Sequence, residues 1–291
     1  MFLDYLRLGF SNLSQRRLRS WLTMIGIFIG VALVVSLISL GQGLQDAVIG
    51  QFAGLGANTL TIQAKGGGFG PPGSYQSVTI GEDDLDVIKK TPGVDEAFGR
   101  LIESVRVTVD DNEEFAYIAT ISDEPDEYRL SLKVPVEFEA AEGRLVKPSD
   151  THAINIGARL AESPVLSREL YVGDKIQING KDFDIVGVLE KTGNPQLDVV
   201  LWLPLSAARD LTGKEESFGL IAAKAEKNAD IDEVKENIEK ALRKERDVEL
   251  GKEDFDVETA QETIDSLNSI IGAVKWFLVG IALISLLVGS V

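Results

Sequence analysis

Two long runs of uncharged, mostly apolar residues lie near the ends of the chain, and about 200 residues of mixed pattern separate them. The first run, Trp21–Leu40, holds twenty residues without a charged side chain. A helix of that length reaches about 30 Å, the thickness of the hydrocarbon core of a bilayer. A cleaved signal peptide would have a shorter apolar stretch and a small-residue cleavage site. The pattern therefore predicts a transmembrane helix over 21–40.

The second apolar run, Trp276–Val291, holds sixteen residues without a charge. Sixteen helical residues reach about 24 Å, which is short for a complete crossing. We therefore expect a second transmembrane helix over 276–291 that continues in a longer protein. Within the first run, Gly26 and Gly30 form a GxxxG pattern, whose small residues let another helix approach closely. These two glycines are the predicted helix-packing site.

The charges around the first run indicate its orientation. Four arginines and one acid precede it, and no Lys or Arg follows it until Lys65. Because positive charge is retained in the cytoplasm, we expect a cell-membrane protein with a cytoplasmic N-terminus and with residues 41–275 outside. Residues 1–20 have apolar positions at helical spacing and predict a helix on the cytoplasmic interface, with a disordered tail as the alternative.

Both apolar runs are extended on the outer side by amphipathic segments. An apolar residue recurs at every fourth position through 41–56, and Gly54 and Gly56 end that pattern. Thr259 and Glu262 have the spacing of a capping box, and apolar residues then follow at 3, 4 and 3 through 259–275. We expect two stalk helices that pack side by side, and two independent amphipathic helices are the alternative. The predicted seam positions are Leu44, Val48, Phe52, Ile264, Leu267, Ile271 and Val274.

The segment between the stalks begins and ends with the same order of elements. Alternating residues predict a strand at 58–65, a helix follows at 82–90, and strands follow at 94–109 and 114–121. Near the end, a strand at 218–225, a helix capped by Asp230 and a strand at 254–258 repeat the order. We therefore expect one α/β domain built from 57–121 and 214–258.

The middle of this segment, 122–213, predicts a different, β-rich subdomain inserted into the first. Asn179-Gly180 is a strong hairpin turn signal between two of its strands. One short helix is expected at 157–162. The expected strands are 153–156, 175–178, 183–189 and 199–203.

Composition excludes several kinds of chemistry. The formal net charge is −17, and because residues 1–20 carry +3, the part after the first apolar run carries −20. Such an acidic surface argues against nucleic acid and promotes solubility. The chain has no cysteine and one histidine, His152, and its acidic clusters at 82–84, 110–114 and 122–127 lack EF-hand spacing. A phosphate-binding GxxxxGK[ST] motif is absent, so we predict no catalytic, cofactor-binding or metal-binding residue.

Short motifs recur in a fixed order along most of the chain. They are Arg19–Thr23, Gly26–Val31, Leu55–Asn58, Gly143-Arg144, Ile156-Gly157, Leu160-Ala161, Val172–Asp174, Gly180, Phe183, Val186–Val188 and Trp202–Leu205. In their order and spacing over 19–211, these motifs resemble the permease subunits of MacB-like ABC transporters, which are related to the LolC/LolE permeases and to FtsX.

The resemblance implies a membrane protein with α-helical spans and an extracytoplasmic α+β domain, made of a split βαβ porter-like part and an inserted β-rich sabre-like part. It implies a dimer of permease subunits in membrane lipid, a separate ATPase chain that binds ATP-Mg, and an extracytoplasmic adaptor in some members. The activity it implies is mechanotransmission, in which the helices pass the motion of the ATPases to the outer domains. A membrane-anchored binding or sensor module is the alternative, and an ectoenzyme would require a catalytic cluster that the sequence lacks.

Overall fold

The computed structural model describes residues 58–65, 79–110, 112–135, 137–162 and 168–290, together with single helical positions between 21 and 43. The chain divides into two compact units, one of residues 50–263 and one of residues 1–49 with 264–291. The predicted interfacial helix at 1–20 and the glycine-rich loop at 66–73 lie outside the described residues.

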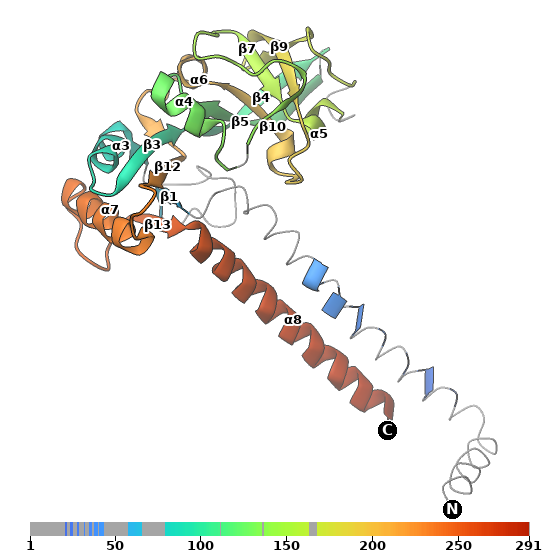
Figure 1. Ribbon diagram of the computed structural model, residues 1–291. Coiled ribbons are helices and arrows are strands. Elements are labelled where there is room, and N and C mark those ends of the chain that lie inside the picture. Colours follow the sequence, from blue (N-terminus) through green and yellow to red (C-terminus); the bar gives the residue numbers. More distant parts are fainter. Residues whose placement is uncertain are drawn as a thin grey trace, which may run out of the picture. The chain divides into compact units, whose positions relative to one another are not determined.

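The larger unit contains a four-stranded antiparallel sheet with the strand order β13-β1-β12-β3 (Figure 1). Its strands come from both ends of the unit and alternate with helices α3 (Glu82–Lys89) and α7 (Ile231–Glu245). Apolar side chains of the sheet and of both helices share one buried cluster. The two predicted strand–helix–strand units are therefore confirmed, and they interleave in one sheet. The strands are β1 (Thr59–Ala64), β3 (Val94–Arg100), β12 (Leu220–Ala225) and β13 (Phe255–Thr259).

A seven-stranded sheet forms the other part of the unit, in the order β6-β9-β7-β10-β5-β4-β8. Because β9 pairs with both β7 and β8, the strands from β9 round to β8 close into a ring. Alternate residues point into this ring and form its core, as the burial of Ile176, Ile178, Phe183 and Ile185 shows. The strands are β4 (Ile102–Val109), β5 (Asn112–Ile121), β6 (Ala140–Gly143), β7 (Ala153–Ile156), β8 (Lys175–Ile178), β9 (Lys181–Leu189) and β10 (Val200–Pro204).

The hairpin between β8 and β9 confirms the turn predicted at Asn179-Gly180. Both residues have positive φ, 48° and 80°, as a two-residue hairpin turn matched to the twist of its strands requires. The short helix predicted at 157–162 is α5 (Ala158–Ala161).

Several further short elements were not predicted. They are α4 (Pro125–Ser131), α6 (Leu205–Thr212), the strand β6 and a small pair formed by β2 (Ile80–Gly81) and β11 (Ser217–Phe218). A 3₁₀ turn, η3 (Leu197–Val199), precedes β10. Helix α4 begins at Pro125 and α6 follows Pro204. Both helices are too short to show a repeated apolar period, so the hydrophobic pattern does not predict them.

The predicted boundary of the insert at 121/122 is wrong. Residues 94–109 form two strands rather than one, because the chain leaves the first sheet after Arg100 and enters the second sheet at Ile102. β4 and β5 therefore belong to the inserted sheet. The alternating pattern gives no sign of this change, because residues 97–101 are all buried and both faces of the strand end are covered.

Helix α8 (Ala260–Ser290) is continuous for 31 residues, so no break separates the predicted stalk, 259–275, from the predicted span, 276–291. In the part of the chain that the structure describes, one helical segment, Ala260–Ile281, has the length and apolar composition to cross a membrane. The helical positions described between 21 and 43 include Trp21, Phe28 and Gly41. The remainder of the first predicted span lies outside the described residues.

Close packing of Phe218 of β11 against β3 makes Gly99 a sensitive position. A Cβ atom added at Gly99 would overlap the aromatic ring of Phe218, which is buried. We predict that Gly99→Ala lowers the free energy of unfolding by about 1–3 kcal/mol, because an extra methyl group in a filled core forces side chains to shift. Chemical denaturation followed by circular dichroism measures the change.

Phe218→Leu provides the control for this prediction, because it shortens the side chain that the new methyl group would strike. The double variant Gly99→Ala/Phe218→Leu should lose less stability than the sum of the two single losses. Strictly additive losses would show that the ring of Phe218 does not limit the space at Gly99.

Candidate functional site

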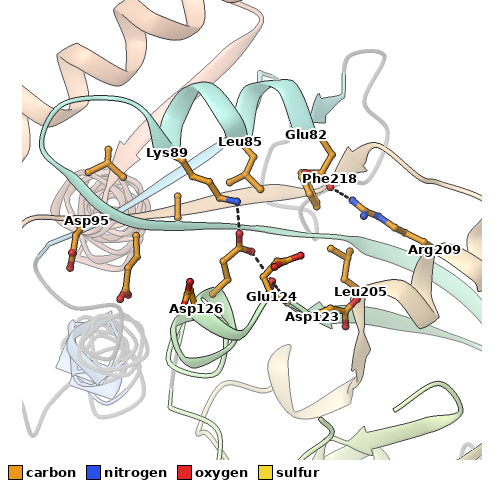
Figure 2. A pocket seen from close by; sticks show the side chains of 15 residues that line it. Glu82, Leu85, Lys89, Asp95, Asp123, Glu124, Asp126, Leu205, Arg209 and Phe218 are labelled. Carbon is orange, nitrogen blue, oxygen red and sulfur yellow. Dashed lines mark hydrogen bonds and ion pairs between the residues drawn. The ribbon is translucent and has the colours of Figure 1, made fainter. Parts of the chain in front are cut away.

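A cleft of about 460 Å³ lies between the two sheets of the larger unit (Figure 2). One wall is made by α3 and β3, and the other wall is made by α4, the residues before it and the start of α6. Glu82, from the acidic cluster at 82–84, meets here the acidic cluster at 122–127. The acidic residues that line the cleft are Glu82, Asp95, Glu96, Asp123, Glu124, Asp126 and Glu127.

Two ion pairs cross the cleft, one from each end of α3. Lys89 pairs with Glu127 of α4, and Glu82 pairs with Arg209 of α6 (Figure 2). The hydroxyl of Ser122 donates a hydrogen bond of 2.6 Å to Glu127, and the guanidinium of Arg209 lies 5.6 Å from the ring centroid of Phe218. These contacts tie the inserted part to the four-stranded sheet at two points.

Helix termini account for much of the acidity of the cleft. Asp126 and Glu127 lie in the first turn of α4, where a negative charge interacts favourably with the helix dipole. Asp123 accepts a hydrogen bond of 2.5 Å from the backbone N–H of Ser206, in the first turn of α6. Among the described residues, no group of three or more His, Cys, Asp or Glu side chains has the geometry to hold a metal ion.

Behind the cleft, the two sheets are joined by the buried side chain of Arg100, which is only 2% exposed. Its guanidinium donates three hydrogen bonds and lies 5.0 Å from the ring centroids of Phe98 and Trp202. The acceptors are the backbone carbonyl oxygens of Thr120 at 3.0 Å, Val134 at 2.7 Å and Ser131 at 2.6 Å. Arg100 thus links β3 to β5 and to the C-terminal end of α4.

No carboxylate makes a hydrogen bond or ion pair with Arg100 within the described part of the chain. Burial lowers its pKa to about 9, so the guanidinium is still protonated at neutral pH. The carbonyl oxygens at the end of α4 carry partial negative charge, and the two aromatic faces are also attractive to a cation. A buried cation is therefore compensated by dipoles and rings rather than by an ion pair.

The start of α8 is fixed to the four-stranded sheet by a capping box, as the sequence predicts. The backbone N–H of Thr259 donates to Glu262 Oε2 at 2.9 Å, and the backbone N–H of Glu262 donates to Thr259 Oγ1 at 3.1 Å. The second carboxylate oxygen, Glu262 Oε1, accepts a hydrogen bond of 2.5 Å from Lys235 on α7.

Burial acts to raise the pKa of Glu262, but the hydrogen bonds from Lys235 and from Thr259 outweigh this effect, so the pKa lies below its ordinary value. Glu262 is therefore ionised at neutral pH and holds both contacts as a carboxylate.

A second network connects the end of α7 to α3 and to the start of β13. Arg246 donates to both carboxylate oxygens of Asp254, at 2.9 and 2.8 Å, and to the buried Asp84 at 2.7 Å. Asp84 also accepts from the backbone N–H of Gly81 at the start of its own helix. The hydrogen bonds from Arg246 hold the pKa of Asp254 below its ordinary value of 3.8.

The structure describes only part of the predicted packing sites. Gly26, Gly30, Leu44, Val48 and Phe52 lie outside the described residues, and so does the side chain of Leu267.

On α8, Ile264 and Ile271 are half-buried and Val274 is 52% exposed. A Cβ atom added at Gly41 would lie 3.7 Å from Lys275 Cδ, so the end of the first helix lies beside α8 at this point. The seam itself stays a prediction.

Two residues that make important contacts in the structure, Arg100 and Lys235, were not predicted from the sequence. Arg100 follows the apolar positions Ala97 and Phe98 in a strand, and a lone arginine in such a setting is a usable sign of a buried, paired charge. Lys235 gives no such sign, because its partner Glu262 is 27 residues away and both lie on otherwise polar helical faces.

The fold of the larger unit is similar to that of two solved extracytoplasmic regions of ABC transporters. The periplasmic region of MacB from Actinobacillus actinomycetemcomitans matches with a TM-score of 0.55 and 17% identity, over 75% of this chain and 95% of that one. The extracellular domain of the noncanonic ABC-type transporter YknZ from Gram-positive bacteria matches with a TM-score of 0.52 and 16% identity, over 69% of this chain and all of that one.

Sequence comparison gives the family. Residues 20–241 match the MacB-like periplasmic core domain. An uncharacterised ABC transporter permease of Methanocaldococcus jannaschii is 34% identical over 99% of this chain and 69% of its own length. The macrolide export ATP-binding/permease protein MacB of Vibrio parahaemolyticus is 26% identical over the whole of this chain, which spans 43% of that relative's length. The chain belongs to the MacB-like family of ABC transporter permeases.

Replacement of Arg100 tests its role as the link between the sheets. We predict that Arg100→Met lowers the free energy of unfolding by about 2–4 kcal/mol, because three buried carbonyl oxygens lose their donor. The stability of Arg100→Lys should lie between that of the wild type and that of Arg100→Met. Its ammonium group keeps a positive donor but lacks the planar fork that reaches all three acceptors. Denaturant unfolding is the measurement.

Arg106→Met serves as the matched control, because Arg106 makes an ion pair with Glu113 in which both side chains are more than half exposed. Its loss should cost less than about 1 kcal/mol. Equal losses in the Arg100→Met and Arg106→Met variants would contradict the importance of the buried guanidinium.

The Arg246 network predicts a dependence of stability on pH. Because the folded-state pKa of Asp254 is depressed, its contribution is complete above the ordinary value of 3.8 and is lost as the pH falls through the folded-state pKa. We expect Arg246→Met to lower the free energy of unfolding by about 2–3 kcal/mol at pH 7, and expect this difference to shrink as the pH falls below 3.8. Thermal unfolding of the wild type and of Arg246→Met, measured from pH 7 to below pH 3.8, gives this difference in stability. A difference that does not change with pH would contradict a contribution from ionised Asp254.

Proposed function

We propose that this chain is the membrane subunit of a MacB-like ABC transporter whose ATP hydrolysis takes place on a separate cytoplasmic ATPase chain. The observation that carries the proposal is the 34% identity to a permease over 99% of this chain. A separate ATPase is supported by the name of that relative, which is a permease, whereas MacB is an ATP-binding/permease protein.

Exposed apolar side chains on the helices support a membrane location. Trp276 is 76% exposed and Phe277 is 70% exposed on α8, and Phe28 is 78% exposed on the first helix. Side chains of this size are exposed in contiguous groups mainly where lipid or a protein partner covers them. We infer a cell-membrane protein with a cytoplasmic N-terminus, two permease subunits per transporter and the larger unit on the outer side.

The mechanism that we propose is mechanotransmission. Closure of the ATPases on ATP and Mg²⁺ moves the membrane helices, and α8 passes this motion to the four-stranded sheet through its capped first turn. The inserted sheet then follows, because Arg100 and the ion pairs from α3 join it to the first sheet. In this mechanism the substrate is moved or released on the outer side, with or without an adaptor, and no path for it through the helices is needed.

Affinity purification of the full-length protein from its native membranes tests the proposal. We expect an ABC ATPase to be retained at a stoichiometric ratio in a mild detergent, because a transporter of this class assembles before it functions. An equally tagged, unrelated membrane protein purified in the same way is the control. Recovery of the permease without an ATPase, at protein concentrations where its dimer persists, would exclude the transporter and favour an anchored binding module.

A further inference from the structure

We propose that Lys235 is a positioning residue that prevents α8 from turning relative to the outer domain, so that motion of the membrane helices reaches both sheets. This inference rests on the proposed function, because it concerns how the proposed motion is passed on. We call the group formed by Lys235, Thr259, Ala260 and Glu262 the coupling joint.

The first argument is the covalent connection between the sheet and the helix. β13 ends at Thr259 and α8 begins at Ala260, so no loop residue separates the strand from the helix. β13 pairs with β1 over five residues, which fixes the strand within its sheet. Rotation of α8 about its axis relative to this sheet would therefore require a change in the backbone at Thr259.

The second argument is a side-chain contact between α7 and α8 that opposes this rotation. Lys235 lies on α7, whose residues Val234, Ile238 and Leu242 are buried in the core, so α7 is firmly attached to the sheet. The Lys235 side chain is only 21% exposed and its ammonium group lies 2.5 Å from Glu262 Oε1. Rotation of α8 about its axis would break this ion pair.

The third argument is that the first residue of α8 packs against a cluster shared by the four-stranded sheet and the inserted part. Ala260 packs against a cluster formed by Phe98 of β3, Ala222 of β12, Leu130 of α4 and Val134. Phe98 and Ala222 belong to the four-stranded sheet, whereas Leu130 and Val134 belong to the inserted part. The first turn of α8, which Lys235 holds through Glu262, therefore packs against both parts of the larger unit.

Because Glu262 uses different oxygens for its two contacts, substitutions can remove the ion pair with Lys235 and keep the helix cap at Thr259. One carboxylate oxygen accepts the Thr259 N–H and the other accepts Lys235. Glu262→Gln keeps an acceptor for the cap but loses the ion pair, and Lys235→Gln loses the ion pair without altering Glu262. Lys235→Arg keeps a positive donor. Lys224→Gln is the matched control, because Lys224 lies on the same sheet and pairs with Asp95 and Glu96 of β3 rather than with a residue of the coupling joint.

The experiment uses spin labels on the full-length permease, purified with its ATPase as a dimer in lipid nanodiscs. The sequence has no cysteine, so single cysteines can be placed at Ala273 on α8 and at Leu250, which is 81% exposed in the loop after α7. Distances between the two copies of each label are measured by pulsed electron paramagnetic resonance, without nucleotide and with ATP and vanadate.

In the wild type and in the Lys224→Gln control, we expect ATP to shift the distances at both positions. In Lys235→Gln and Glu262→Gln, the shift at Ala273 and the ATPase rate should persist, while the shift at Leu250 should fall at least twofold. Lys235→Arg should show the wild-type shift at Leu250. A full shift at Leu250 in Lys235→Gln would overturn the role of Lys235 and leave the proposed function intact. No shift at either position in the wild type would instead overturn mechanotransmission itself.

Discussion

The guanidinium of Arg100 is the charge around which the two sheets are assembled. It lies at the last residue of β3, where the chain passes from the first sheet into the second, and its three acceptors all belong to the inserted part. A buried cation without a carboxylate tolerates little displacement, because each of its donors must stay within reach of a carbonyl oxygen. The relative placement of the sheets within the larger unit is therefore set by directional contacts as well as by apolar packing.

The acidic cleft can be understood from the same arrangement. Once Arg100 holds the C-terminal end of α4, the N-terminal end of that helix faces α3, and acids suited to a helix N-terminus meet a second acidic cluster. Lys89 and Arg209 relieve part of this repulsion through ion pairs. The cleft thus combines like charges that oppose closure with two pairs that favour it, and salt weakens both effects.

Most of the elements could be predicted from the sequence, because long periodic patterns follow burial on one face. The strands at 153–156 and 175–178, the turn at Asn179-Gly180 and the capping box at Thr259 are local features, and each was predicted at its correct place. The change of sheet at Leu101 was missed because burial on both faces removes the alternation. Lys235 was missed because its partner is distant in sequence, and no local pattern encodes such a pair.

Closure of the inserted sheet into a ring limits how another chain can bind to this part of the larger unit. An open sheet presents unpaired backbone groups to which another chain can add a strand. Among the described strands of this sheet, the ring leaves only β6 with a free edge, and β6 is four residues long and irregular in its pairing. A partner of the inserted part can therefore extend its sheet only at this short strand, and elsewhere on the ring it must recognise side chains and loops.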